Sequence, residues 1–137
     1  MNRKLFVYGT LRRDAKHELS SLLERHARFV GRGAVRGKLY DLGDYPGLRS
    51  EEDGRVLGDV YEINEKSWSF IIHRLDEYEG CSPSDPEPHE YRRDIVPVYL
   101  RGGRTLSAWA YVLNRDPKGL TEIVSGDYMS WRLKAGA

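Results

Sequence analysis

Residues 27–48 (ARFVGRGAVRGKLYDLGDYPGL) most constrain the fold, because β-forming residues are interrupted there by a glycine every few positions. Glycines at such intervals permit bulges and sharp bends in strands. The pattern predicts short, bent strands of the kind found in a small barrel. Residues 91–100 and 105–113 alternate around a Gly-Gly turn, so we expect a β-hairpin there. Pro97 places the first of these two strands at a sheet edge or at a bulge.

The strongest helix signal is NEKSWSFIIHRLDEYEG, residues 64–80. Asn64 is a favourable N-cap, and Gly80 is a favourable stop at the position after the C-cap. The apolar stripe between them consists of Trp68, Ile71, Ile72 and Leu75. Shorter helices are expected within residues 16–26 and within the tail, residues 119–133. Because strands outnumber helices, the sequence predicts the α+β class with a curled or barrel-like sheet.

Composition and length argue against several classes of protein. The 137 residues fit a single domain, residues 1–137, and the 22 basic and 21 acidic residues nearly balance. We therefore expect neither nucleic acid nor an anionic membrane as a partner. Cys81 is the only cysteine, which excludes an internal disulfide and a multi-cysteine zinc site. The apolar run at residues 5–8 is too short for a secretion signal, so the protein is expected to be cytoplasmic.

Glu79 lies where the predicted helix should bury an apolar side chain. With about 100° of turn per residue, Glu79 falls within about 60° of Ile72, on the face of the apolar stripe. Burial disfavours the charged carboxylate and raises its pKa, and the negative end of the helix dipole acts in the same direction. Such a carboxyl can serve as a general base or acid near neutral pH. Two structural alternatives stay open: Glu79 pairs with Arg92 or Arg93, or the last helical turn frays and exposes it.

The stretch YGTL follows an apolar run that predicts a buried first strand. Gly9 permits backbone conformations that other residues avoid, so a tight turn is expected. Successive free N–H groups of Tyr8, Gly9, Thr10 and Leu11 in such a turn can form a small anion-binding concavity. An ordinary turn without a ligand is the other interpretation.

Six stretches together resemble the γ-glutamylcyclotransferase-like superfamily, also called AIG2-like. They are VYGTLRR (7–13), LYDLGDYPGL (39–48), GDVYEI (58–63), LDEYEG (75–80), YRRDIVPV (91–98) and AWAYV (108–112). The resemblance covers nearly the whole chain, and the combination of YGTL with LDEYEG is its most specific part. Within the superfamily the chain most resembles the γ-glutamylamine cyclotransferase branch, in which LDEYEG also continues with a cysteine and a proline-containing loop.

The resemblance implies a small mixed β-barrel with flanking helices and a cavity at its mouth. It implies that Glu79 accepts a proton and that Tyr8, Gly9, Thr10 and Leu11 form the substrate-binding loop. The implied reaction is a cofactor-free release of 5-oxoproline from a small-molecule γ-glutamyl amine or a related γ-glutamyl compound.

Other residues carry weaker signals. Tyr91 and Tyr111 can line the cavity, although packing in the core is the commoner role for a tyrosine. Cys81 has no histidine placed to activate it as a nucleophile. The acidic loop at residues 81–90 is expected beside the site, where it could set the preference for a leaving group. No metal is expected, because the four histidines are scattered: His17, His26, His73 and His89.

Two functions of different class fit these observations. One is a cyclotransferase, and the other is a non-catalytic module that binds a small metabolite on the same barrel. An amide hydrolase that releases glutamate is a weaker third possibility. The resemblance supports the site more than the substrate, and the sequence fixes neither the leaving amine nor the oligomeric state.

Overall fold

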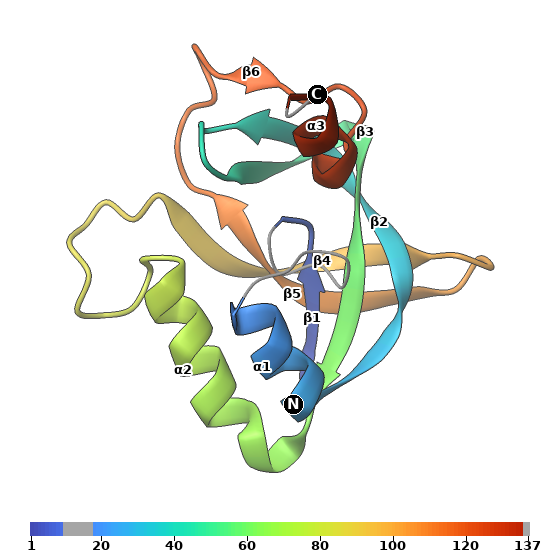
Figure 1. Ribbon diagram of the computed structural model, residues 1–137, viewed down its shortest axis with the longest axis vertical. Coiled ribbons are helices and arrows are strands. Elements are labelled where there is room, and N and C mark those ends of the chain that lie inside the picture. Colours follow the sequence, from blue (N-terminus) through green and yellow to red (C-terminus); the bar gives the residue numbers. More distant parts are fainter. Residues whose placement is uncertain (10–17, 136–137) are drawn as a thin grey trace.

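The computed structural model describes residues 1–9 and 18–135, which form a β-barrel flanked by helices (Figure 1). In chain order the elements are β1 (Lys4–Val7), α1 (Glu18–His26), β2 (Ala27–Asp41), β3 (Pro46–Ile63), the 3₁₀ turn η1 (Glu65–Ser67), α2 (Trp68–Tyr78), β4 (Tyr91–Leu100), β5 (Thr105–Leu113), β6 (Thr121–Glu122) and α3 (Tyr128–Ala135). Within these residues, no helix is both long enough and apolar enough to cross a membrane.

Five strands close the barrel through a ring of pairings. β3 pairs with β1 on one side and with β2 on the other, β2 continues to β4, and β4 continues to β5. The ring closes where Leu5 of β1 pairs with Trp109 of β5. That closing pair is parallel and the rest of the ring is antiparallel, so the predicted α+β fold with a small mixed β-barrel and flanking helices is confirmed. β6 lies outside the ring, beside the end of β2.

The prediction of several short strands for residues 27–48 is wrong. β2 is one strand of 15 residues, and β3, which begins within the same stretch, has 18 residues. The two stay paired across two register shifts, one of them between Arg36 and Gly37. A side chain at Gly37 would place its Cβ 2.3 Å from the carbonyl oxygen of Arg49. Glycine therefore lets a continuous strand bend and lets its neighbour approach closely, instead of interrupting the strand.

The predicted hairpin is present as β4 and β5. Pro97 pairs with Ser107 of β5, whereas β2 meets β4 only at Tyr99 and Leu100 within the described residues. Pro97 therefore lies on a sheet edge, as expected for a residue that has no N–H to donate.

The helix predicted for residues 64–80 is present as η1 followed by α2. Asn64 occupies the N-cap position of η1 as predicted, but its side chain makes no capping hydrogen bond. At the other end Gly80 has a φ of +71°, and the helix stops there as predicted. The stripe of Ile71, Ile72 and Leu75 is buried.

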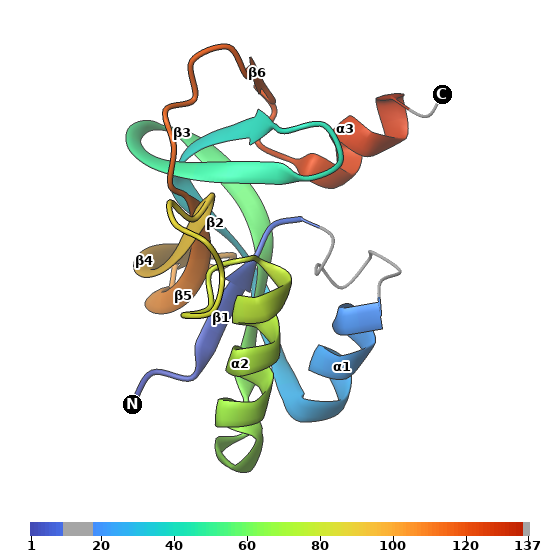
Figure 2. The ribbon, with the colours of Figure 1, turned by 90° about the vertical axis from the view of Figure 1, so that its left-hand side faces the viewer.

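Alternation along the first strand divides the buried side chains between two hydrophobic clusters. Phe6 and Tyr8 belong to the cluster inside the barrel. Leu5 belongs to an outer cluster together with Leu23 of α1 and Leu75 of α2. Figure 2 shows both helices on this outer side of the barrel.

The tail forms β6 and α3 where a single helix within residues 119–133 was expected. Tyr128 at the start of α3 is buried in the inner cluster. The Leu57 N–H donates to the Gly126 carbonyl oxygen at 2.8 Å. The tail therefore packs over one end of the barrel, as Figure 1 shows.

Candidate active site

A cavity of about 440 Å³ opens between the end of α2 and the start of β3. It is lined by Phe6, Val7, Tyr8, Gly9, Tyr45, Pro46, Tyr78, Glu79, Gly80, Glu90, Tyr91 and Tyr111. Five of the residues that the sequence singled out thus lie around one hollow: Tyr8, Gly9, Glu79, Tyr91 and Tyr111. Thr10 and Leu11, predicted with them, lie outside the described residues.

The end of α2 places Glu79 at the cavity wall. Glu79 is the C-cap residue, and Gly80 follows it in the left-handed conformation. The Gly80 N–H donates to the Glu77 carbonyl oxygen at 3.1 Å, and the Cys81 N–H donates to that of Asp76 at 3.0 Å. These two bonds form a Schellman motif. The last helical turn is therefore closed rather than frayed, and Glu79 stays on the side that faces the barrel.

The surroundings of Glu79 favour its neutral form. Burial raises its pKa from the ordinary value of 4.5 to about 7, and the nearby carboxylates of Asp76 and Glu90 act in the same direction. Neither expected ion pair forms, because Arg93 pairs with Asp76 and Arg92 pairs with a neighbour on its own strand. Near neutral pH the carboxyl is therefore present in both forms, as a group that passes a proton in both directions requires.

Asp76 anchors the wall next to Glu79. The Tyr111 hydroxyl donates to Asp76 Oδ1 at 2.7 Å. Arg93 holds the same carboxylate with both Nε and Nη2, at 2.9 and 3.2 Å, and its guanidinium lies 4.7 Å from the ring centroid of Trp109. Sequence reasoning missed Asp76. Its spacing of three residues from Glu79 was the available signal, because residues three apart share a helix face.

Two further tyrosines fix the cavity wall through main-chain groups. The Tyr8 hydroxyl donates to the Tyr111 carbonyl oxygen at 2.5 Å and accepts from the Leu48 N–H at 3.1 Å. The Tyr91 hydroxyl donates to the Pro46 carbonyl oxygen at 2.5 Å. Burial raises the pKa of both hydroxyls. They are therefore poor proton donors, and their rings form a rigid, largely apolar wall.

Gly9 lies at the cavity rim for a different reason from the one expected. The φ angle of Gly9 is not positive. A Cβ at this position would approach Pro46 Cγ to 3.1 Å and Cδ to 3.3 Å. The absence of a side chain at Gly9 eases the close approach of the chain to the start of β3, and the positive φ that would mark an unusual backbone conformation is not found.

Tyr45 and Glu90 form an outer rim that sequence reasoning missed. The Tyr45 hydroxyl donates to Glu90 Oε1 at 2.6 Å, and this bond is the main reason why the pKa of Tyr45 rises to about 12. Arg115 Nη1 lies 3.9 Å from Glu90 Oε2. Glu90 ends the acidic loop at residues 81–90, so this end of the loop does lie beside the cavity. The two partners are 45 positions apart in the chain, which explains why no local pattern revealed the pair.

The arrangement suits proton transfer on a small, neutral or cationic group. Among the described lining residues, the ionisable side chains are carboxyls and tyrosines, with no lysine or arginine. The thiol of Cys81, next to the cavity, has its pKa raised to about 11, first by burial and then by nearby carboxylates. Cys81 is therefore protonated and a poor nucleophile. Among the described residues that line the cavity, Glu79 is the group with a pKa raised to about 7, so it can exchange a proton near neutral pH.

Comparison with known proteins places the chain in a family. The model of the AIG2-like gamma-glutamyl cyclotransferase family matches residues 5–130. A relative from Methanocaldococcus jannaschii is 31% identical over 131 residues, which are 93% of this chain and 97% of that protein. The gamma-glutamylcyclotransferase family protein YtfP of Escherichia coli K12 is 31% identical over 127 residues, 92% of this chain and 96% of its own.

A solved structure supports the same relationship. The crystal structure of an AIG2-like protein from mouse superposes with a TM-score of 0.70 at 26% identity, over 92% of this chain and 87% of the mouse chain. The barrel, the helices around it and the sequence match therefore agree. The chain belongs to the AIG2-like gamma-glutamyl cyclotransferase family.

Proposed function

We propose that this protein is a cyclotransferase that releases 5-oxoproline from a γ-glutamyl amine or a related small γ-glutamyl compound, with Glu79 as general base and acid. The observation that carries the proposal is a carboxyl with a pKa of about 7 at the wall of a 440 Å³ cavity. The family assignment supports the reaction class. The leaving amine is not specified by the cavity's lining.

The reaction needs one proton carrier. The α-amine of the γ-glutamyl group attacks its own γ-carbonyl carbon, and a C–N bond closes the five-membered lactam. Glu79 takes the proton that the amine loses. The bond between the γ-carbon and the leaving nitrogen then breaks, and the proton returns from Glu79 to that nitrogen. Atoms and charge balance without water or a redox partner, and a pKa near 7 suits both transfers.

Positioning accounts for much of the expected acceleration. An attack within one molecule gains most when the chain is held in the reacting geometry. The rings of Tyr8, Tyr91 and Tyr111 are immobilised by their hydroxyl hydrogen bonds, so they can hold the folded γ-glutamyl chain and limit access of water. In this proposal, as the family resemblance implies, N–H groups of the turn at residues 8–11 bind the substrate carboxylate or the developing oxyanion.

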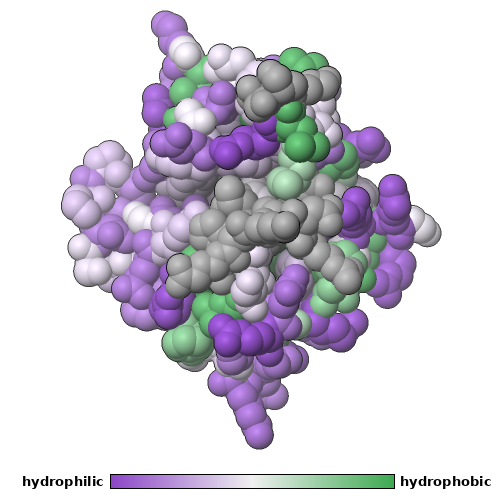
Figure 3. All heavy atoms as spheres, in the orientation of Figure 1, coloured by the Kyte–Doolittle hydropathy of each residue, from purple (hydrophilic) through white to green (hydrophobic). Residues whose placement is uncertain are grey.

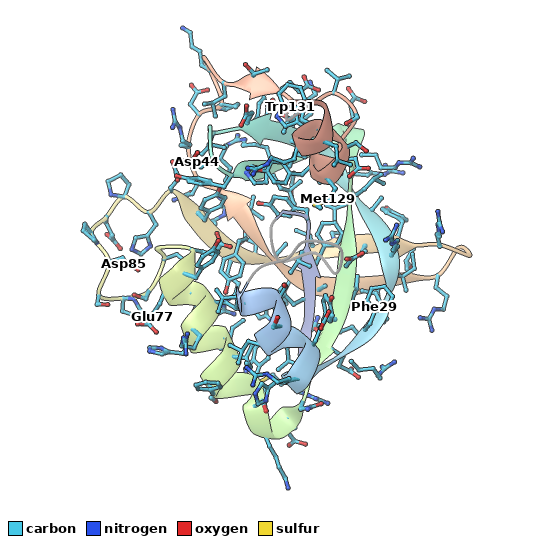
Figure 4. All side chains as sticks on the ribbon, viewed as in Figure 1. Phe29, Asp44, Glu77, Asp85, Met129 and Trp131 are labelled. Atoms are coloured by element: carbon cyan, nitrogen blue, oxygen red, sulfur yellow. The ribbon has the colours of Figure 1, made fainter. Side chains whose placement is uncertain are left out.

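The test is the release of 5-oxoproline by Glu79→Gln. We expect a decrease in turnover of roughly 10²- to 10⁴-fold, because glutamine keeps the shape but cannot accept the proton. The matched control is Glu77→Gln, two residues earlier on the same helix. Glu77 is 53% exposed, is labelled at the outer side of α2 in Figure 4, and pairs with His73 at 3.4 Å.

Three results separate the alternatives. Equal loss in both variants, or unchanged turnover in Glu79→Gln, removes Glu79 from the mechanism. Thermal stabilisation by γ-glutamyl compounds with no product in the wild-type protein favours a non-catalytic binding module. Free glutamate instead of 5-oxoproline indicates an amide hydrolase.

A further inference from the structure

A second hollow, of about 640 Å³, lies against β2, β3 and the end of β4. It is lined by Arg32, Gly33, Ala34, Val35, Arg36, Glu52, Gly54, Arg55, Leu57, Gly58, Tyr99, Leu100, Arg101 and Asp127. None of these residues lines the candidate active site. Many hydrophilic side chains lie over β2 and the β4–β5 hairpin at the right of Figure 3. We call this second hollow the arginine groove.

Four arginines, three from strands and one from a turn, line the arginine groove. Arg32 and Arg36 belong to β2, Arg55 to β3, and Arg101 to the turn after β4. All four are exposed, whereas the alternate side chains, such as Val35, fill the barrel. The arrangement follows from strand alternation, which directs every second side chain outward.

Two of these arginines form a like-charge pair across the sheet. Arg36 lies directly opposite Arg55 in the register of β2 with β3. Like charges in such positions destabilise a sheet, because directly opposite side chains are near neighbours. An anion bound between the two guanidinium groups would convert this repulsion into attraction.

Acidic side chains offset part of the positive charge of the arginine groove. Within the described residues, Arg36, Arg55 and Arg101 form no ion pair, whereas Arg32 Nε lies 3.8 Å from Asp59 Oδ1. Asp127 is engaged at the start of α3, where it accepts from the Ser130 hydroxyl at 2.9 Å and from the Met129 N–H at 3.2 Å. Glu52 is the other acid of the lining.

Tyr99 organises one wall of the arginine groove. Tyr99 is 42% exposed, and the Arg36 guanidinium lies over its ring, 5.5 Å from the centroid. Stacking on an aromatic face restrains the orientation of a guanidinium group while leaving its N–H donors free to bind a ligand. Arg36 is thereby held in place on one side of the groove, across from Arg55.

We propose that the arginine groove is a second binding site, for a small polyanion that carries two or more phosphate groups. Guanidinium groups bind phosphate oxygens in a bidentate manner, and several of them around one hollow fit a ligand with several phosphates. The barrel strands hold three of the four arginines, and Arg101 follows directly after β4. This site does not depend on the proposed cyclotransferase activity, and each of the two proposals is tested separately.

The test is a titration with inorganic pyrophosphate at low salt, followed by NMR chemical shifts of the backbone amides. Saturable shifts are expected at residues of the arginine groove and not around Glu79, and added NaCl should weaken the binding. Arg36→Gln and Arg55→Gln should each raise the dissociation constant by roughly tenfold or more, as expected for loss of a charge-assisted hydrogen bond. A parallel titration with ATP shows whether a base and ribose add affinity beyond the phosphates.

The control is Arg74→Gln on α2, which removes an exposed arginine that stacks on Phe70 outside the groove. It should bind pyrophosphate as the wild type does. Thermal unfolding of each variant checks that the fold is intact. The proposal is overturned by non-saturable shifts, by shifts centred on the Glu79 cavity, or by an equal loss of affinity in Arg74→Gln.

Discussion

At the residue scale, three carboxyl groups and one arginine determine the chemistry of the candidate site. Asp76 and Glu90 are negatively charged neighbours that raise the pKa of Glu79 further after burial has raised it. Arg93 compensates the charge of Asp76 but forms no bond to Glu79. The helix therefore supplies the proton carrier and, one turn earlier, part of the electrostatic field that tunes it.

This arrangement predicts the pH dependence of activity. Because the ionised form of Glu79 acts as the base, kcat/KM should rise with pH and level off above the pKa of about 7. Asp76→Asn removes a neighbouring negative charge and frees Arg93. Both effects lower the pKa of Glu79, so the rise of kcat/KM should move to lower pH. Asp94→Asn, which removes a carboxylate paired with Arg92, is the control. If kcat/KM of Asp76→Asn rises at the same pH as that of the wild type, the assignment of Glu79 as the base is contradicted.

Residue patterns in the sequence predicted part of this site. Helical periodicity placed Glu79 on the inner face, because that inference needs only neighbours on the same helix. The partners of Asp76 could not be predicted in this way, since Tyr111 and Arg93 come from the β-hairpin. Which of two adjacent arginines meets a helical acid depends on strand register, and register is set by the closed barrel.

At the element scale, the end of α2 shows how local chemistry positions a functional group. Gly80 was predicted as the stop, and its left-handed conformation allows the two Schellman bonds that fix the last turn. The bent strands β2 and β3 were not predicted as continuous. A glycine pattern is the same for a strand break and for a bulge, and only the cross-strand partner distinguishes the two.

Gly80→Ala should destabilise the protein and disturb the site. A left-handed conformation costs a residue with a Cβ about 1–2 kcal/mol, and that loss should appear in urea unfolding. Gly80→Asn should lose less, because asparagine tolerates this conformation better. Turnover should decrease along with stability if the turn also orients Glu79. Equal stability of all three proteins would show that the turn is not constrained as described.

At the scale of the whole molecule, the barrel closes through a contact between residues about one hundred positions apart, Leu5 and Trp109. The class of fold could be predicted from alternation and turn signals, but this closure could not, because no local pattern encodes which strand edges meet. The family resemblance supplied that expectation. Burial of Glu79 is a product of the same closure, since the cavity wall combines β1, β5 and the end of α2.

The buried carboxyl should make folding stability depend on pH. A group whose pKa is higher in the folded state than in the unfolded state contributes stability that is present at low pH and lost as pH rises through the folded value. Wild type should therefore lose stability relative to Glu79→Gln between about pH 4.5 and about pH 7. The difference should be on the order of 1–3 kcal/mol. Urea unfolding at pH 5 and pH 8 measures it, and a pH-independent difference would contradict the burial.

The Tyr8 hydroxyl joins three strands at the inner end of the cavity, since it follows β1 and bonds the main chain of Tyr111 on β5 and of Leu48 on β3. A longer molecule could penetrate deeper only by pushing this ring aside, which would leave two main-chain groups without partners at a cost of about 1–3 kcal/mol each. The Tyr8 ring thus limits how far a bound compound can extend into the barrel. Chemical variety can be accommodated only where the compound emerges, beside Tyr45 and Glu90.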